Sequence, residues 1–396
     1  MRKLSPHHWC AGALTFGMLL MLAGCPTPDK ATDTTTLIDT TTPPITASPV
    51  YLVGGVGTGS EQTSTYPCYW KNGTYNALQT PTDEREGAYQ GNAYAAVVSG
   101  GSVYITGNVK NGEYGDAIPC YWKDGAYTAL AMSTLTLLEN GEVWTVAVSN
   151  GLPYLAGDLT DFDGDYLPCY WANGECNLLS LSGGEVSYRN GSAYGLGMNG
   201  GTPYICGIVE DSDRIEKPSL WSDGVLEILD TDQYSAGDAN ALAIFGNSVI
   251  VAGAVYSRSE ETGSIPCCWT GGTYNPLEYP DGGGGYATAM TVSGGSVYIA
   301  GYVWSVDSQS ESQSTSYNPC YWKDGLRTDL PSVDSSSSPS IWAIVVSNGV
   351  VCVGGTSNNT PYAWTDGTYA ALPLPGEASQ GWVNGGARSL KAAKMK

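Results

Sequence analysis

The seven residues "PCYWKDG" occur twice in this chain without a change, at Pro119–Gly125 and at Pro319–Gly325. Both copies fit the pattern Pro-x-x-Trp-x-x-Gly, which is found seven times in all. The tryptophans of the pattern follow one another at intervals of 42 to 53 residues: Trp70, Trp122, Trp171, Trp221, Trp269, Trp322 and Trp364. Seven copies in register indicate an internal repeat of about 50 residues.

A second motif, an apolar run that ends near a glycine, keeps the same period. Examples are "VYITGN" at 103–108 and "VYIAGY" at 297–302. In six units another alternating or apolar run precedes this motif, so a full unit holds four short strands, which we name a to d. Ser-Gly-Gly or Ser-Asn-Gly joins a to b, and Lys-Asp-Gly or Lys-Asn-Gly joins c to d in several units. Such residues tolerate the positive φ angles of tight hairpin turns.

Seven units of four antiparallel strands predict an all-β fold, a seven-bladed β-propeller. An open β-solenoid is the alternative, although solenoid repeats are usually shorter. The first unit begins directly at its strand b, so it lacks a strand a. We expect "GWVNGG", at Gly381–Gly386, to pair beside Val50–Gly54 and complete the first blade. Closure by this C-terminal strand hides the sheet edges that an open array exposes.

The repeat layout resembles two known families, and the resemblance covers Ser48 to about Leu374. One is kelch, whose double glycine is present at Gly54-Gly55 and at Gly354-Gly355. The other is the HAF-type repeat of bacterial extracellular proteins, with Trp-x-Asp/Asn-Gly, a following Leu and an Ala-x-x-Val-x-x-Gly stretch. Both resemblances imply a propeller, and neither implies a particular activity, because propellers carry many functions.

The N-terminus has the features of an export signal. An apolar run from Ala11 to Leu22 is shorter than the roughly 20 residues of a spanning helix, and it ends in Leu-Ala-Gly-Cys at Cys25. This ending resembles the lipobox of bacterial lipoproteins, which implies cleavage before Cys25 and acylation of its thiol. An ordinary signal peptide with a chance cysteine is the alternative. Pro26 stands where many lipoproteins kept in the inner membrane have aspartate, which favours the outer membrane or the cell surface.

Composition predicts four segments. Residues 1–24 are a lipoprotein signal peptide, 25–47 a Thr- and Pro-rich flexible tether, 48–387 the propeller, and 388–396 a basic C-terminal tail. The formal net charge of the chain at pH 7 is −21, which argues against nucleic acid as a partner. We expect a monomer that contacts the membrane through its N-terminal lipid.

Catalytic chemistry is restricted by the absence of histidine after residue 8. A mature chain without histidine cannot use Ser-His-Asp or Cys-His catalysis or His-ligated zinc. The sequence also contains no P-loop, nucleophile elbow or dinucleotide fingerprint. We therefore expect no catalytic role and no required cofactor.

The repeated cysteines and tryptophans are interpreted as packing residues. Five units place a cysteine directly after the proline of the motif. Equivalent positions in different blades lie beyond the roughly 7 Å Cα separation that a disulfide allows, so we expect free, buried thiols. The seven tryptophans occupy the same place in every unit, which favours packing between blades over ligand contact.

The loops fall into two sets. With alternating strand directions, the a–b and c–d turns share one face, which we call the tight-turn face, and the b–c and d–a loops share the opposite, long-loop face. Every long insertion belongs to the second set, which is typical of a scaffold that presents a recognition surface and also of neutral drift. Six aromatic residues of this face are candidate contacts for a protein or glycan ligand: Tyr89, Tyr166, Tyr188, Tyr234, Trp304 and Tyr317.

One long loop has the composition of a calcium ligand set. Asp161, Asp163 and Asp165 alternate along it, Gly164 permits a sharp turn, and Asp158 is nearby. Alternating carboxylates with a glycine can surround Ca²⁺. The glycine and the closing glutamate of an EF-hand are missing from their places, so a solvated acidic loop is the alternative.

These observations predict a lipid-anchored propeller of the bacterial cell envelope. We expect it to bind a protein or a glycan through its long b–c and d–a loops, without catalysis. The alternative is a glycosidase-like enzyme that uses paired carboxylates and needs no histidine. Its candidate acids on the long-loop face are Asp83, Glu84, Glu86, Asp211 and Asp213.

Overall fold

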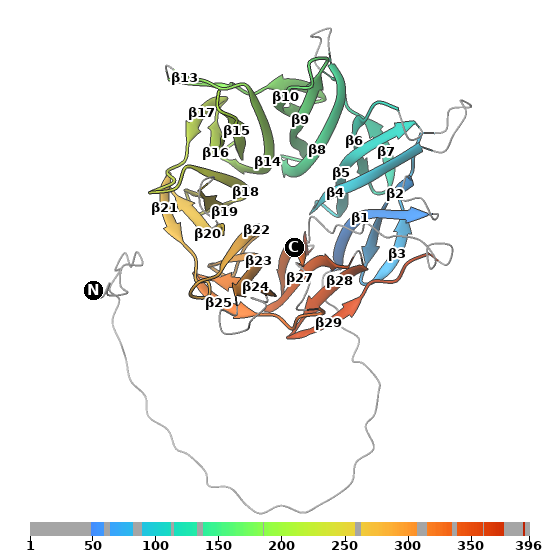
Figure 1. Ribbon diagram of the computed structural model, residues 1–396. Helices are drawn as coiled ribbons and strands as arrows, with labels where there is room; N and C mark the ends of the chain where they lie inside the picture. The colour runs from blue at the N-terminus through green and yellow to red at the C-terminus, as the bar shows by residue number, and fades with distance from the viewer. Residues whose placement is uncertain are drawn as a thin grey trace, which may run out of the picture. The chain divides into compact units, whose positions relative to one another are not determined.

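The computed structural model (Figure 1) describes part of the chain in detail: residues 49–58, 64–81, 89–111, 115–132, 138–184, 186–257, 263–306, 315–334, 339–358, 360–375 and 391–392. All of them lie in the second of two units, Thr46–Lys396. The predictions made for Cys25, for the tether and for Gly381–Gly386 fall outside the described residues.

The described residues form a seven-bladed β-propeller, as the sequence predicts. Seven four-stranded antiparallel sheets follow one another around a ring, and the part of the chain described here contains no helix (Figure 1). Consequently it offers no helix long and apolar enough to cross a membrane. In six blades the strand order is a-b-c-d, with strand a on the inside of the ring.

The strand bounds are as follows. The a strands are β4 (Tyr89–Ser99), β8 (Leu138–Ser149), β14 (Asn190–Asn199), β18 (Ala236–Phe245), β22 (Gly284–Ser293) and β26 (Ser340–Ser347). The b strands are β1 (Val50–Thr58), β5 (Ser102–Asn111), β9 (Leu152–Asp161), β15 (Thr202–Glu210), β19 (Ser248–Tyr256), β23 (Ser296–Val306) and β27 (Val350–Ser357).

The outer strands are shorter. The c strands are β2 (Ser64–Lys71), β6 (Ile118–Lys123), β10 (Tyr166–Ala172), β16 (Glu216–Ser222), β20 (Ile265–Thr270), β24 (Thr315–Lys323) and β28 (Thr360–Thr365). The d strands are β3 (Thr74–Ala77), β7 (Ala126–Ala129), β11 (Glu175–Leu178), β17 (Val225–Ile228), β21 (Thr273–Pro276), β25 (Leu326–Asp329) and β29 (Thr368–Ala371). A small hairpin, β12 (Ser182–Gly183) with β13 (Val186–Ser187), lies between blades 3 and 4 in sequence.

A C-terminal strand completes the first blade, as the sequence predicts. β30 (Lys391–Ala392) pairs antiparallel with Val50 and Tyr51 of β1. It belongs to the segment assigned above to the tail.

The repeated tryptophans join each blade to the one before it. Every motif tryptophan is at most 1% exposed. Its indole N–H donates to the backbone carbonyl of the residue that follows the repeat leucine of the preceding blade. The seven acceptors are Pro373, Gln79, Ala131, Ser180, Asp230, Glu278 and Pro331. The bond from Trp70 to Pro373 joins blade 1 to blade 7, so the ring is closed by packing as well as by β30.

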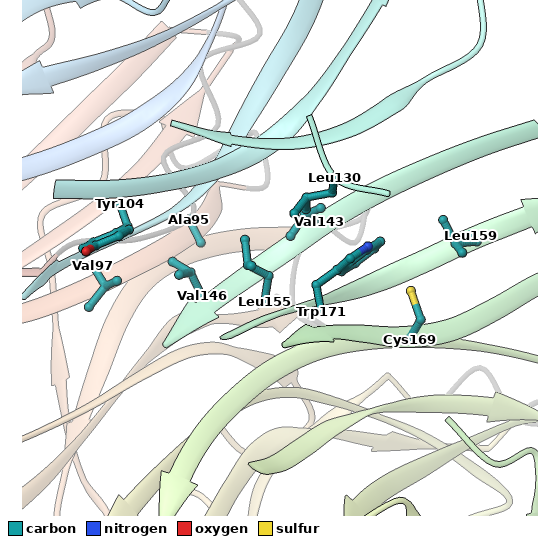
Figure 2. Close-up of a cluster of buried hydrophobic side chains, with 10 residues drawn as sticks. All are labelled: Ala95, Val97, Tyr104, Leu130, Val143, Val146, Leu155, Leu159, Cys169 and Trp171. Atoms are coloured by element: carbon teal, nitrogen blue, oxygen red, sulfur yellow. The ribbon is translucent and has the colours of Figure 1, made fainter. Parts of the chain in front are cut away.

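The hydrophobic core is divided into seven clusters, one at each junction between neighbouring blades. Figure 2 shows the junction of blades 2 and 3, where the Trp171 ring lies near Leu155 and Cys169 of its own blade. Leu130 of blade 2 belongs to the same cluster. This arrangement confirms that the tryptophans pack between blades.

The turns of the tight-turn face have the predicted chemistry. Six c–d turns place Asn or Asp in the left-handed region before a glycine, with φ of 48 to 54°: Asn72, Asp124, Asn173, Asp223, Asp324 and Asp366. In several blades the same side chain accepts a backbone N–H near the start of strand b, as Asp124 does from Val103 at 2.8 Å. The turn residue therefore also joins the c–d turn to the a–b hairpin of its blade.

The nine described cysteines are free, and eight of them are buried. Burial raises the pKa of the Cys268 thiol to about 11 and that of Cys120 well above the ordinary value. These thiols are therefore protonated packing groups at neutral pH, as the repeat pattern predicts.

Candidate functional site

The inner strand of blades 2 to 7 carries a β-bulge at the same place. The register between strands a and b shifts by one residue in blades 2 to 7. The extra residues are Tyr94, Trp144, Tyr194, Asn240, Thr288 and Trp342. A bulge re-aims its side chain and bends the strand, so six blades direct one residue each to equivalent places around the ring.

The glycine of strand b is explained by this bulge. A Cβ atom on Gly253 would clash with the carbonyl oxygen of Asp238, two residues before the bulge residue Asn240. The equivalent carbonyl meets the equivalent glycine in five other blades, as Asn92 meets Gly107. Only glycine permits so close a backbone approach. This close contact explains why strand b has glycine at this position in the blades with a bulge.

The bulge residues encircle the central channel. Trp144, Tyr194, Asn240, Thr288 and Trp342 line two cavities at once, one of about 120 Å³ and one of about 390 Å³. The smaller cavity is lined by residues that follow the bulges, toward the tight-turn face. The larger one is lined by Ile208, Glu216 and Asp238 in addition, which lie toward the long-loop face. We call this larger cavity the channel mouth.

Two carboxylates of the channel mouth meet at one hydroxyl group. The Tyr256 side chain is hydrogen-bonded to Glu216 Oε2 and, at 3.1 Å, to Asp238 Oδ1. Burial and then the negative charge of Glu216 raise the pKa of Asp238 to about 7, against the lowering effect of the Tyr256 hydrogen bond. Tyr256 has only one proton to donate, so a proton on Asp238 completes the group. Burial and Asp238 raise the pKa of Tyr256, which keeps it a donor.

A second acidic group lies one blade away. The indole N–H of Trp144 donates to Asp158 Oδ2 at 2.7 Å, and the Tyr94 ring lies 4.4 Å from the Trp144 ring. Glu142 accepts from Tyr94 Oη and Asn108 Nδ2. Burial, and then the charge of Asp158, raise the pKa of Tyr194, and Asp238 and Glu216 add to the effect. Carboxylates of three blades therefore lie around Tyr194.

Three of the predicted aromatic contacts come together on the long-loop face. Tyr234 and Trp304 line a cavity of about 680 Å³ formed by blades 5 and 6. The Tyr317 ring lies 6.4 Å from the Trp304 ring. The backbones of Gly263 and Gly284 pack so closely on the Trp304 indole that a Cβ at either position would clash with it. Gly263, before β20, and Gly284, the first residue of β22, thus make room for this ring.

The other three predicted contacts are separated from that cavity. Tyr89 is buried in the core between blades 1 and 2. Tyr188 packs against the core between blades 3 and 4. Tyr166 is 50% exposed at the start of β10, and its backbone N–H donates to Asn190 Oδ1.

The aspartates of the predicted calcium loop are not brought together. Asp161 Oδ1 accepts the backbone N–H groups of Asp163 and Asp165, both at 2.9 Å, and so holds its own turn. Asp165 pairs with Arg189 at 3.4 Å, and Asp158 faces Trp144 instead. Within the described ranges, no three acidic, Cys or His side chains form a group able to hold a metal ion.

The acids proposed for the enzyme alternative have different places. Asp83, Glu84 and Glu86 lie outside the described residues. Asp211 forms the same turn as Asp161, accepting from Asp213 and Ile215, and it also pairs with Lys217 at 3.6 Å. The carboxylates that do approach each other are Glu216 and Asp238, which sequence reasoning missed.

A signal for the channel mouth is nevertheless present in the sequence. Each bulge residue stands 13 positions before the strand-b glycine of its blade, as Tyr94 does before Gly107 and Trp342 before Gly355. At this fixed position the residue type changes from unit to unit while its neighbours stay small or apolar. Alternation along the strand assumes a regular register, and it therefore hides a bulge.

Comparisons with known proteins place the chain in no family. No family model matches the sequence, and no curated protein matches it. Solved structures with partial similarity include a puromycin-hydrolysing peptidase of Mycobacterium tuberculosis, with a TM-score of 0.45 and 10% identity over 72% of this chain. A mutant Trypanosoma rangeli sialidase displaying trans-sialidase activity gives 0.43 and 10% over 82%, and the propeller domain of the Trilobed protease from Pyrococcus furiosus 0.39 and 11% over 72%.

The extent of these matches is limited. The chain spans 46% of the length of the peptidase, 57% of the sialidase chain and 86% of the protease domain. Similarity at this level carries no argument about activity. The kelch and HAF-type resemblances therefore stay predictions.

Proposed function

We propose that this protein is a non-catalytic binding module of the bacterial cell envelope, anchored by a lipid on Cys25, that takes a protein or glycan ligand at the channel mouth. One observation carries the proposal. Five blades contribute to a cavity of about 390 Å³ that is lined by three aromatic rings, two carboxylates and polar side chains. Ligand sites of proteins have this size and this mixture of apolar surface with a few polar groups.

The side chains of the mouth also differ from those that hold the fold. The motif tryptophans are fully buried, whereas Trp144, Tyr194 and Trp342 keep part of their surface exposed to the channel. The Glu216–Asp238 pair opposes folding, because burying neighbouring carboxylates is unfavourable. Residues that break the rules of a stable core are expected where function requires them.

The test is a binding screen of the full-length protein on glycan and peptide arrays. We expect Trp144→Ala and Trp342→Ala each to weaken a reproducible hit at least tenfold, because a stacking ring is lost. Tyr369→Ala, which removes a ring that is 43% exposed on an outer strand, is the matched control and should bind like the wild type. Hits that both tryptophan variants retain would place the ligand elsewhere and end the proposal.

The anchor is tested separately. In a bacterial host, the wild type should incorporate labelled palmitate and sediment with membranes. Cys25→Ser should lose the label and appear in the soluble fraction, because the acylated thiol is absent. A wild type that incorporates no palmitate would contradict the lipid anchor and support the alternative, an ordinary signal peptide with a chance cysteine.

One observation favours the enzyme alternative enough to keep it. Two carboxyl groups that contact the same hydroxyl oxygen are no farther apart than about 6 Å, near the separation found in retaining glycosidases. Asp238, with its raised pKa, would be the acid and Glu216 the nucleophile. Glycoside hydrolysis by the wild type that falls at least a thousandfold in Glu216→Gln would establish this alternative over the binding module.

A further inference from the structure

We infer that the group bound in the channel mouth is an organic cation, a protonated amine or a quaternary ammonium, held between the Glu216–Asp238 pair and the rings of Trp144, Tyr194 and Trp342. The inference rests on the proposed binding function and names the chemistry of its ligand.

The lining of the mouth carries negative charge without a counter-charge. Glu216 and Asp238 belong to it, and neither lysine nor arginine does. Lys217, next to Glu216 in β16, turns away, and its Nζ contacts the Ser235 carbonyl at 2.8 Å and Asp211. Among the described residues, no ion pair involves Glu216 or Asp238. A bound cation supplies the missing charge.

The hydrogen bonds of the pair are incomplete in the same sense. Two carboxyl groups share the one proton of Tyr256. The other titratable groups around them are Tyr194 on β14, Tyr286 on β22, Cys267 on β20 and, beyond Tyr194, Asp158 on β9. None of these groups carries a positive charge, so a cationic donor to the pair has to come from outside the described residues. An alkylammonium group brings up to three N–H donors and a positive charge together.

The rings suit the same ligand. Trp and Tyr faces attract cations, most strongly where water is excluded. The Trp144 ring is fixed by its hydrogen bond to Asp158 and by contact with Tyr94. A neutral sugar also stacks on such rings, but its hydroxyl groups leave the charge of the carboxylates unbalanced. The lining therefore favours the cation.

The experiment compares charged ligands with matched neutral ones by isothermal titration calorimetry on the full-length protein. Three pairs separate the sources of the cation: deacetylated against acetylated glucosamine oligomers, a lysine peptide against its acetyl-lysine form, and choline against 3,3-dimethyl-1-butanol. We expect the charged member of at least one pair to bind at least tenfold more tightly. Its affinity should rise about tenfold from pH 5.5 to pH 8, as Asp238 loses its proton.

Variants assign the effect to the site. Asp238→Asn and Glu216→Gln should each weaken the charged ligand at least tenfold at pH 8. Asp366→Asn is the matched control, because it changes the net charge equally at a turn where other blades have asparagine. Thermal melting verifies that each variant is folded, and two independent carboxylate variants keep the test valid if one of them is not.

The two proposals fail in different ways. Neutral members that bind as tightly as charged ones, with binding lost in Trp342→Ala, would leave the binding site standing and overturn the cation. The cation would also be overturned if charged ligands bound Asp238→Asn and Glu216→Gln as tightly as they bind the wild type. If no charged probe binds, the cation is likewise refuted, and the array screen alone decides the binding function.

Discussion

Two positions of the repeat have different surroundings in this propeller. The motif tryptophan is buried between blades, and the bulge residue lines the central channel. At the Pro-x-x-Trp position the residue is the same in all seven blades, fully buried, and bonded to the preceding blade. At the bulge position blades 2 to 7 carry Tyr, Trp, Tyr, Asn, Thr and Trp. Both positions recur with the period of the repeat, yet one is constant and the other varies.

The difference follows from what each position contacts. A motif tryptophan must fit an almost identical junction seven times, and each junction supplies the same acceptor after the repeat leucine. A bulge residue faces the channel, where the ring symmetry places no such demand. Constancy therefore indicates packing, and variation at a geometrically equivalent place is compatible with the ligand site proposed above.

The largest effect is expected from a pair of tryptophans in blade 3. Trp171→Ala should lower the free energy of unfolding by about 3–5 kcal/mol, because it leaves a cavity and an unpaired carbonyl on Ala131. Trp144→Ala, at the bulge, should lower it by no more than about 1–2 kcal/mol. Urea denaturation of the full chain measures both. Equal losses would remove the distinction between frame and site.

The next effect concerns the glycine that holds the bulge. Gly253→Ala should cost about 2–3 kcal/mol, because the new Cβ meets the Asp238 carbonyl. It should also weaken ligand binding, since Asp238 and Asn240 move with the strand. Ser248→Ala, at the exposed start of the same strand, is the control. A Gly253→Ala protein that retains wild-type stability and binding would show that the bulge is not fixed by this contact.

The frame could be predicted from the sequence because its causes are local or repeated. In the c–d turns, Asn or Asp followed by Gly adopts positive φ angles, and the types of these two residues are enough to predict this. The tryptophans could be assigned to packing because they recur seven times. The long-loop face was also correctly separated from the tight-turn face, since strand parity alone decides it.

The channel mouth could not be predicted in the same way. A bulge depends on which residues of two strands pair, and the sequence pattern of one strand does not contain that register. Glu216 and Asp238 lie in different blades and are brought together through Tyr256, from β19, the strand that follows both of them in sequence.

A smaller effect on stability is expected from the titration of Asp238, which lines the channel mouth and not the junctions between blades. Its folded-state pKa of about 7 exceeds the ordinary carboxyl value of about 3.9, so the native state retains a proton that the unfolded chain has lost between these pH values. Stability should therefore fall as the pH rises from about 4 to about 7. Asp238→Asn should flatten this slope and stabilise the protein by about 2 kcal/mol at pH 8. Asp366→Asn should change neither quantity, and a wild-type slope in Asp238→Asn would assign the titration to another group.

The smallest effect returns to the loop predicted to bind calcium. Asp161→Ala removes the acceptor of two turn N–H groups and should cost about 1 kcal/mol. Asp211→Ala removes the same turn in blade 4 and should cost slightly more, since it also loses Lys217. Because Asp161 already serves its own backbone, millimolar calcium should leave the melting temperature of the wild type unchanged. A rise with calcium that disappears in Asp163→Asn would restore the metal site, and the varied long-loop face would then contain two binding sites of different chemistry.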